Sequence, residues 1–135
     1  MKRKNKIEVL DIGTGTGCIP ISLAKNLENV KISAIDVSKE ALKVAKQNAR
    51  LNNVEVDFLE VDILKAESLM SVRAQSRTQT NKQFNIIVSN PPYVRELEKV
   101  EINNNVLQNE PHLALFVADE NPLVFYKKIA DLAKQ

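Results

Sequence analysis

Short runs of apolar, mostly β-branched or aliphatic residues divide this chain, and they lie at 7–12, 30–36, 54–62 and 84–90. Runs of this length and composition are typical of strands that are buried in a sheet. The last run has a continuous apolar centre, IIV, which favours burial on both faces of the sheet. The pattern therefore predicts four strands.

Segments with helical spacing of apolar residues lie between these runs. Residues 18–27 have this spacing, Ser38 is placed to cap a helix that continues to about Leu51, and the spacing returns from 121 to the end. Strands that alternate with helices favour βαβ units, in which right-handed crossovers bring parallel strands side by side. We therefore predict an α/β fold with a parallel sheet.

Two polar segments interrupt this pattern. Residues 74–83 contain one apolar residue, so they offer almost nothing to a core and are predicted to form a mobile surface loop. Residues 93–110 carry the sequence INNN and little periodicity. We expect a long loop there, near the functional site.

The composition is that of a globular protein and limits the function. The chain has 135 residues, of which 44% are hydrophobic and 27% are charged, so we expect one domain, 1–135. A net charge of +2 is too small to indicate a nucleic-acid or membrane partner, and no run approaches the roughly 20 apolar residues of a membrane span. The single cysteine, Cys18, permits no internal disulfide and no cysteine-built metal site. We interpret the chain as cytoplasmic.

The glycines of the chain, Gly13, Gly15 and Gly17, all lie in the stretch DIGTGTG, between a predicted strand and a predicted helix. A glycine turn at this place lets the backbone approach a ligand closely and exposes helix amides that bind anionic groups. A dinucleotide-binding loop would need glycine at the position of Cys18, which disfavours a nicotinamide cofactor. The alternative is that the glycines only permit a tight turn.

The observed pattern, D-x-G-x-G-x-G, resembles motif I of the S-adenosylmethionine-dependent methyltransferases with a Rossmann-like fold. The resemblance implies a loop that cradles the amino-acid portion of the cofactor and is formed by Gly13, Thr14, Gly15 and Gly17. It also implies that Asp11 accepts a hydrogen bond from the ammonium group of the cofactor, directly or through water.

Acidic residues end the second and third predicted strands. Asp36 is placed to accept hydrogen bonds from ribose hydroxyls, with Val37 beside it in the cofactor site, and its alternative role is at the start of the next helix. By the same resemblance, Asp62 would meet the adenine amino group and Ile63 would pack against the ring. Asp62 is equally suited to cap a helix that starts near Leu64.

The motif NPPY, formed by Asn90, Pro91, Pro92 and Tyr93, directly follows the fourth predicted strand. Sites in open α/β sheets lie outside the carboxyl ends of the strands, which places this motif beside the glycine loop. The motif belongs to methyltransferases that modify planar nitrogen groups, whose delocalised lone pair gains from fixed orientation. The Asn90 side chain and the Pro91 carbonyl can accept both hydrogens of one NH2 group, and Tyr93 would stack on its plane. The alternative is a rigid proline turn with an aromatic plug.

The chain as a whole resembles the glutamine methyltransferases that act on peptide chain release factors. The matching phrases are VLDIGTGTGCIPISLA at 9–24, AIDVSKEALKVAKQNA at 34–49, FNIIVSNPPYV at 84–94 and EPHLALF at 110–116. The resemblance implies S-adenosylmethionine as cofactor and methyl transfer to the side-chain amide of the glutamine in a release factor's Gly-Gly-Gln loop. Nucleic-acid amino-methyltransferases share NPPY, but the last phrase resembles the release-factor family.

The implied chemistry leaves several reactive side chains without a part in it. The methyl donor is already activated, so no metal and no catalytic histidine are needed, and His112 is expected to take no part. Cys18 is expected to pack beneath the glycine loop, and no role is assigned to Glu110.

The chain departs from that family at both ends and in one loop. Family members have an amino-terminal helical domain and further strands, whereas this sequence begins just before the first predicted strand and stops after a helix that follows the fourth. The fourth strand is therefore expected to be an exposed edge that invites pairing with another chain. Members also continue with glycines where this chain has VADENP, at 117–122.

Three alternatives stay open. A nucleic-acid amino-methyltransferase would place a planar base between Tyr93 and Asn90. If the absent parts are needed to hold the substrate, the chain would bind the cofactor without turnover. A nicotinamide-binding domain is disfavoured by Cys18 and by NPPY.

Overall fold

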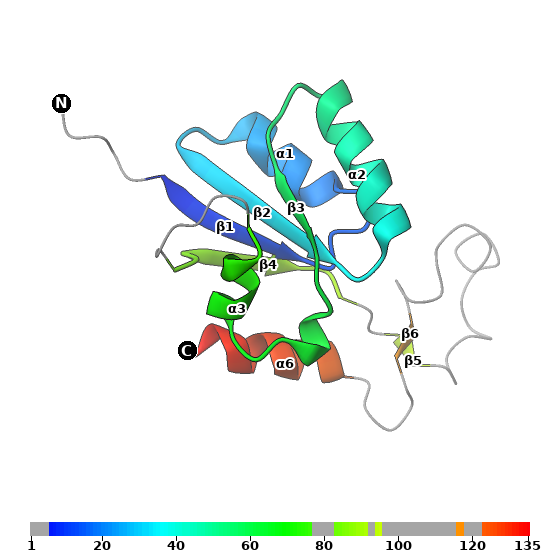
Figure 1. Ribbon diagram of the computed structural model, residues 1–135, viewed down its shortest axis with the longest axis vertical. Coiled ribbons are helices and arrows are strands. Elements are labelled where there is room, and N and C mark those ends of the chain that lie inside the picture. The colour runs from blue at the N-terminus through cyan, green and yellow to red at the C-terminus, as the bar shows by residue number, and fades with distance from the viewer. Residues whose placement is uncertain (1–5, 77–82, 92–93, 96–115, 118–122) are drawn as a thin grey trace.

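The computed structural model describes residues 6–76, 83–91, 94–95, 116–117 and 123–135. Within these ranges, four parallel strands form one sheet in the order β3-β2-β1-β4, with helices on both faces (Figure 1). The strands are β1 (Ile7–Ile12), β2 (Val30–Asp36), β3 (Asp57–Glu60) and β4 (Ile86–Ser89). The predicted α/β fold with a parallel sheet is confirmed.

The strand order reverses at β1. The chain moves outward from β1 to β2 and β3, and then returns to the other side of β1 with β4. Such a reversal opens a crevice outside the carboxyl ends of the two strands, and ligands of open α/β sheets bind there. The topology therefore points to the carboxyl ends of β1 and β4 as the site.

The two outer strands are shorter than the apolar runs that predicted them. The β2–β3 ladder extends only from the pair Ser33 and Asp57 to the pair Asp36 and Glu60. Val54, which begins the apolar run, donates its backbone N–H to the Ala49 carbonyl at 3.1 Å and so belongs to the connection after the preceding helix. Val54 and Val56 lie outside the ladder, but they are apolar because they still pack against the core.

One face of the sheet is covered by α1 (Cys18–Asn26) and α2 (Lys39–Leu51). Ser38 caps α2 as predicted, since its hydroxyl accepts a hydrogen bond from Ala41 N at 3.1 Å. The core on this face consists of Ile21, Ala34, Leu42, Ala45, Ala49 and Phe58. Its three alanines allow α2 to lie close to the sheet and to α1.

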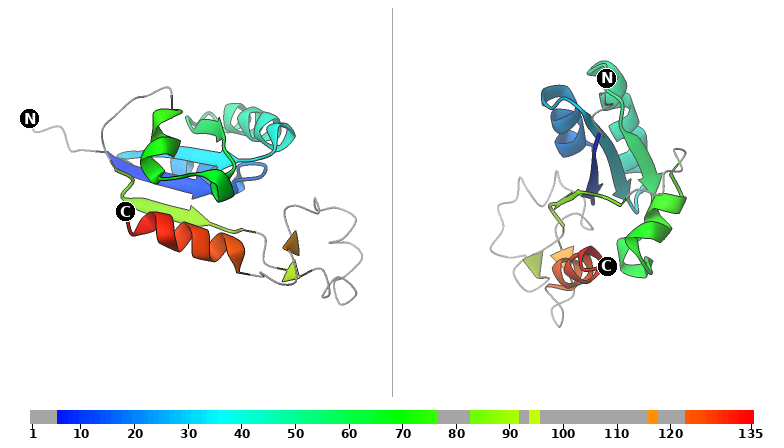
Figure 2. Two further views of the ribbon diagram at one scale, coloured as in Figure 1. Left: turned by 60° about the horizontal axis from the view of Figure 1, so that its bottom comes forward. Right: turned by 90° about the vertical axis from the view of Figure 1, so that its left-hand side faces the viewer.

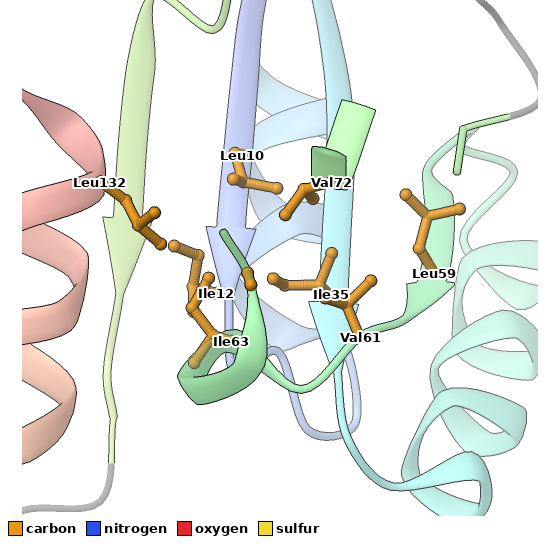
Figure 3. Close-up of a cluster of buried hydrophobic side chains, with 9 residues drawn as sticks. Leu10, Ile12, Ile35, Leu59, Val61, Ile63, Val72 and Leu132 are labelled. Atoms are coloured by element: carbon orange, nitrogen blue, oxygen red, sulfur yellow. The ribbon is translucent and has the colours of Figure 1, made fainter. Parts of the chain in front are cut away.

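The opposite face is covered by the short 3-10 helix η1 (Ile63–Lys65), by α3 (Leu69–Ala74) and by α6 (Val124–Ala133). The right-hand view of Figure 2 shows α3 and α6 on the side of the sheet away from α1 and α2. Their core cluster, shown in Figure 3, consists of Leu10, Ile12, Ile35, Leu59, Val61, Ile63, Ala66, Val72 and Leu132. Burial on both faces explains why apolar residues stand at adjacent positions of the strands, as Val9 and Leu10 do in β1 and Ala34 and Ile35 do in β2.

Helix α3 was not predicted, and it shortens the loop that was expected at 74–83. Ser68 and Ser71 form a capping box at its start. Ala74 is the last residue of α3, and Ser76 is buried and donates its hydroxyl to the Asp57 carboxylate. The polar segment therefore takes part in the fold as far as Ser76, and 77–82 lie outside the described residues.

The segment after β4 contains two further strands. β5 (Val94–Arg95) pairs in parallel with β6 (Phe116–Val117). The rest of the loop expected at 93–110, and the phrase VADENP at 117–122 except for its first residue, lie outside the described residues. The helix expected from 121 begins at Val124.

Strand β4 is an edge of the sheet, as the sequence predicts. In the described part of the chain it pairs only with β1, and its first residue, Ile86, is 46% exposed. No helix in that part is long and apolar enough to cross a membrane.

Candidate functional site

The glycine loop connects β1 to α1 with an unusual backbone. Gly13, Gly15 and Gly17 all have positive φ, at 73°, 56° and 83°. A β-carbon added at Gly13 or Gly15 would meet no atom within 4 Å, whereas one at Gly17 would lie 3.0 Å from the Ala45 β-carbon. The first two glycines therefore border open space, and the third lets the loop rest on α2.

Asp11 lies beneath this loop, on β1, and its carboxylate is unpaired. Its side chain is fully buried, and within the described residues neither carboxylate oxygen has a hydrogen-bond partner. Burial raises the pKa of Asp11 to about 6; the charge of Asp36 adds to the rise, and the nearby Thr14 hydroxyl partly offsets it. That hydroxyl is itself buried without a hydrogen bond of normal geometry. Unpaired buried polar groups are costly in a free protein, and an ammonium group is a ligand that would satisfy them.

The amino terminus of α1 has a partial positive charge, opposite in sign to the charge of Asp11. No side chain caps it, and its first turn holds no acidic residue. Free amides and the positive end of the helix dipole favour an anionic group at this place. Together with Asp11, the loop therefore fits the zwitterionic amino-acid portion of S-adenosylmethionine.

Asp36 performs the local role that the sequence left open, and it also holds the loop. Its Oδ1 accepts a hydrogen bond from Ser38 N at 2.9 Å, and its Oδ2 accepts one from Gly15 N at 2.8 Å. Each carboxylate oxygen has a second lone pair, so contact with ribose hydroxyls stays a prediction. Val37, the next residue, is 54% exposed at the same end of β2.

Asp62 caps η1. Its Oδ1 accepts a hydrogen bond from Leu64 N at 3.0 Å, and its Oδ2 lies 3.3 Å from Lys65 Nζ. Ile63 is buried in the core cluster, beside Ile12 in Figure 3. The capping role is therefore present, and the contacts of Asp62 and Ile63 with adenine stay predictions.

The register of β4 places Asn90 at the same edge of the sheet as the glycine loop. Ser89 pairs with Ile12, and its hydroxyl donates to the Ile12 carbonyl at 2.7 Å. Asn90, the next residue, is exposed, and Pro91 is buried. Asn90 and Gly13 thus follow paired residues of adjacent strands, on the two sides of the switch point.

The other residues of the predicted site lie outside the described part of the chain. They are Pro92, Tyr93, Glu110 and His112. The described residues contain no group of histidine, cysteine and acidic side chains that could hold a metal ion. Cys18 is exposed at the start of α1, with its sulfur 3.6 Å from the Thr16 hydroxyl, so it does not pack beneath the loop as expected.

Sequence reasoning missed one contact of the loop. Asn48, in the third turn of α2, donates its side-chain N–H to the Thr16 carbonyl at 3.0 Å. The two residues are 32 positions apart. Nothing in the spacing of α2 distinguishes this asparagine from other polar residues on its surface, so only the folded arrangement reveals it.

Comparison with known proteins gives this site its context. Residues 1–115 match the family model of the methyltransferase small domain. The chain belongs to this family. The chain is 57% identical, over 127 residues, to the release factor glutamine methyltransferase of Flavobacterium psychrophilum, covering 94% of this chain and 41% of that protein. It is 47% identical to the enzyme of the same name from Bacteroides thetaiotaomicron, covering 94% of this chain and 42% of that protein. The chain thus spans about two fifths of the length of these relatives.

A solved structure supports the fold of the methyltransferase domain. The hMettl16 catalytic domain, crystallised in complex with the MAT2A 3'UTR hairpin 1, superimposes with a TM-score of 0.66 over 95% of this chain and 45% of that one. The sequences are 22% identical, so the likeness concerns the fold alone. The Rossmann-like methyltransferase fold expected from the sequence is confirmed.

Proposed function

We propose that this chain takes part in S-adenosylmethionine-dependent methyl transfer to the side-chain amide of a glutamine in a peptide chain release factor. The observation that carries the proposal is the shared name of two relatives, 57% and 47% identical over 94% of the chain. The glutamine is that of the Gly-Gly-Gln loop, as the resemblance implies. Because release factors act at the ribosome, the proposal includes a cytoplasmic location.

The amino-acid portion of the cofactor would be held by groups that are unsatisfied in the described part of the free chain. Asp11 would receive the ammonium group, and the uncapped start of α1 would receive the carboxylate. Asp36 and Val37 would bind the ribose side of the nucleoside. Asp62 and Ile63 would bind adenine. When bound, S-adenosylmethionine supplies an activated methyl group on its sulfonium.

The chain's part in the chemistry would be to orient the substrate nitrogen. An amide nitrogen is a poor nucleophile because its lone pair is delocalised, so a fixed position at the methyl group matters more than a base. The Asn90 side-chain oxygen and the Pro91 carbonyl would accept its two hydrogens and stabilise the positive charge that develops on the nitrogen as its bond to the methyl carbon forms and the sulfur–methyl bond breaks. S-adenosylhomocysteine would then leave, and the methylated nitrogen would release one of its protons to water. The sequence motif assigns Pro92 to hold this turn rigid and Tyr93 to stack on the amide plane.

Asn90→Ala tests this assignment. We expect transfer to a release factor to fall at least about a hundredfold, because an oriented acceptor of this kind contributes roughly that much. The affinity for S-adenosylmethionine should be nearly unchanged. Mass spectrometry of the release factor measures transfer, and calorimetry measures affinity. Asn26→Ala is the matched control, since Asn26 is an exposed asparagine of α1 whose side chain, within the described residues, bonds to the Ser22 carbonyl of its own helix.

The same assay separates this proposal from the alternatives. Methylation of RNA or DNA with an unmodified release factor would favour a nucleic-acid amino-methyltransferase. Binding of S-adenosylmethionine without transfer to any of the three would favour cofactor binding without turnover. Transfer that persists in Asn90→Ala would contradict the proposed clamp.

The proposal also includes a second protein contact. The exposed edge of β4, with Ile86 46% exposed, is a surface at which another strand can pair. Self-association of the chain should then increase with concentration in sedimentation velocity. A single monomeric species at all concentrations would remove this part of the proposal.

A further inference from the structure

The first half of the glycine loop is held by the end of β2. The Ile35 carbonyl accepts hydrogen bonds from Gly13 N and Thr14 N, at 2.9 Å and 3.0 Å. The Asp36 carboxylate accepts the N–H of Gly15 at 2.8 Å. These three contacts fix the part of the loop that borders open space.

The second half is held by α2. Asn48 Nδ2 donates to the Thr16 carbonyl at 3.0 Å, and the bare α-carbon of Gly17 lies against Ala45. The Gly17 N–H bonds to the Thr14 carbonyl, within the loop itself. Among the described residues, Asn48 is the one side chain outside the loop that hydrogen-bonds to the backbone of this half.

The bond made by Asn48 acts on the last peptide before α1. A peptide is planar, so fixing the Thr16 carbonyl also fixes the direction of the Gly17 N–H. Gly17 is the N-cap of α1, whose uncapped amides form the proposed anion site. Asn48 and the bond from Gly17 N–H to the Thr14 carbonyl therefore together fix how the start of α1 is presented to the space over Gly13 and Gly15.

We propose that Asn48 is a positioning residue of the cofactor site: through the Thr16 carbonyl it holds the loop in the form that binds S-adenosylmethionine, without touching the cofactor. The inference rests on the proposed function for its ligand. Its structural part, the anchoring of the loop, concerns the free chain and can be measured without any ligand.

The test uses Asn48→Ala, which removes the donor, and Asn48→Asp, which keeps the shape but presents an oxygen to the Thr16 carbonyl. Asn52→Ala is the matched control. Asn52 is a half-buried asparagine one turn further along, which bonds to the Asn48 carbonyl and to Lys25 Nζ and, within the described residues, makes no hydrogen bond to the backbone of the loop. Its loss should lower stability about as much without disturbing the loop.

Two quantities are measured in all variants: the Kd for S-adenosylmethionine, and the amide hydrogen exchange rate of Gly17 in the free chain. We expect the Kd to rise about threefold in Asn48→Ala and about tenfold in Asn48→Asp, as the loss of one hydrogen bond and its replacement by repulsion imply. Exchange at Gly17 should become faster in the same order. Asn52→Ala should change neither by more than about twofold.

Equal Kd values in the wild type and both Asn48 variants would overturn the inference, as would equal losses in Asn52→Ala. If the wild-type chain binds no S-adenosylmethionine, the proposed function fails for this chain. In that case the amide exchange rates still test whether Asn48 anchors the loop. Unchanged exchange at Gly17 in Asn48→Asp would show that Asn48 does not hold the loop.

Discussion

Glu8 and Asp11 are carboxylates of the same strand, and their surroundings differ sharply. Both are buried, at 4% and 0% exposure. Being three residues apart on a strand, they point to opposite faces of the sheet. Glu8 lies at the amino-terminal half of β1, where its carboxylate accepts a hydrogen bond from Arg73 at 3.1 Å. Asp11 lies at the carboxyl-terminal half, and in the described part of the chain neither of its carboxylate oxygens has a hydrogen-bond partner.

Around Glu8, the buried carboxylate is paired in a structural network. The Arg73 guanidinium is 3% exposed, lies 4.0 Å from the centre of the Phe84 ring and ties α3 to β1. Asn85 adds a reciprocal pair, since its side chain accepts the Glu8 N–H and its own N–H donates to the Glu8 carbonyl, both at 2.8 Å. The buried carboxylate at this end of β1 is thus paired in the free chain, whereas the Asp11 carboxylate at the other end has no hydrogen-bond partner among the described residues.

Arg73→Ala should produce the largest effect on stability. It would leave the Glu8 carboxylate buried without its cation, which typically costs about 3–5 kcal/mol. Urea unfolding followed by circular dichroism measures this loss. The double variant Glu8→Gln/Arg73→Met should recover much of it, because neither charge is then left alone. A loss below about 1 kcal/mol in Arg73→Ala would mean that the network is not structural.

The pH dependence of stability should reveal Asp11. Its pKa in the folded chain is about 6, above the ordinary value of 3.8, so between these values the folded state binds more protons than the unfolded state. The contribution of this group to stability is therefore fully present below about pH 4 and is lost as pH rises through 6, by about 3 kcal/mol.

Asp11→Asn isolates that contribution. We expect the free energy of unfolding of the wild type to fall between pH 4 and pH 7 relative to that of Asp11→Asn. The variant should therefore become more stable, relative to the wild type, as pH rises. Parallel curves would show that the Asp11 carboxylate is not buried and unpaired in the free chain.

Alanine substitutions should separate the two kinds of glycine in the loop. Gly17→Ala combines a strained positive φ with a clash against Ala45 and should cost about 2–3 kcal/mol of stability. Gly13→Ala meets open space and should cost only about 1 kcal/mol, from backbone strain. Thermal unfolding ranks the two, and equal losses would show that Gly17 is not needed for packing on α2.

The sequence predicted those parts of the molecule that local patterns determine. The bounds of β1 and β2 were correct because each apolar run ends at a residue that breaks it, Gly13 in one case and the Asp36 turn in the other. The predicted cap of α2 at Ser38 was correct because a serine directly before a helical segment is a local signal for an N-cap. The sequence also predicted that Asp11, Asp36 and Asn90 lie at one edge of the sheet, because each lies at or beside the carboxyl end of a predicted parallel strand.

Features that depend on contacts between distant segments were not predictable. Arg73 meets Glu8 across 65 positions, and Asn48 meets Thr16 across 32. Helix α3 is only six residues long, too short for a periodic apolar pattern, and its one local signal was the pair of serines in its capping box. That the Asp11 carboxylate has no hydrogen-bond partner among the described residues depends on the folded positions of its neighbours, which no local pattern reveals.

The central claim is that the unpaired end of β1 is prepared for the ammonium group of a ligand. Isothermal titration with S-adenosylmethionine at pH 7 tests it in the wild type, in Asp11→Asn and in Asp131→Asn, a control at an exposed aspartate of α6. We predict that the wild type and the control bind alike, and that Asp11→Asn binds about 10- to 100-fold more weakly, as expected for the loss of a hydrogen bond to a charged group. Equal affinity in all three proteins, or no binding by the wild type, would contradict the claim.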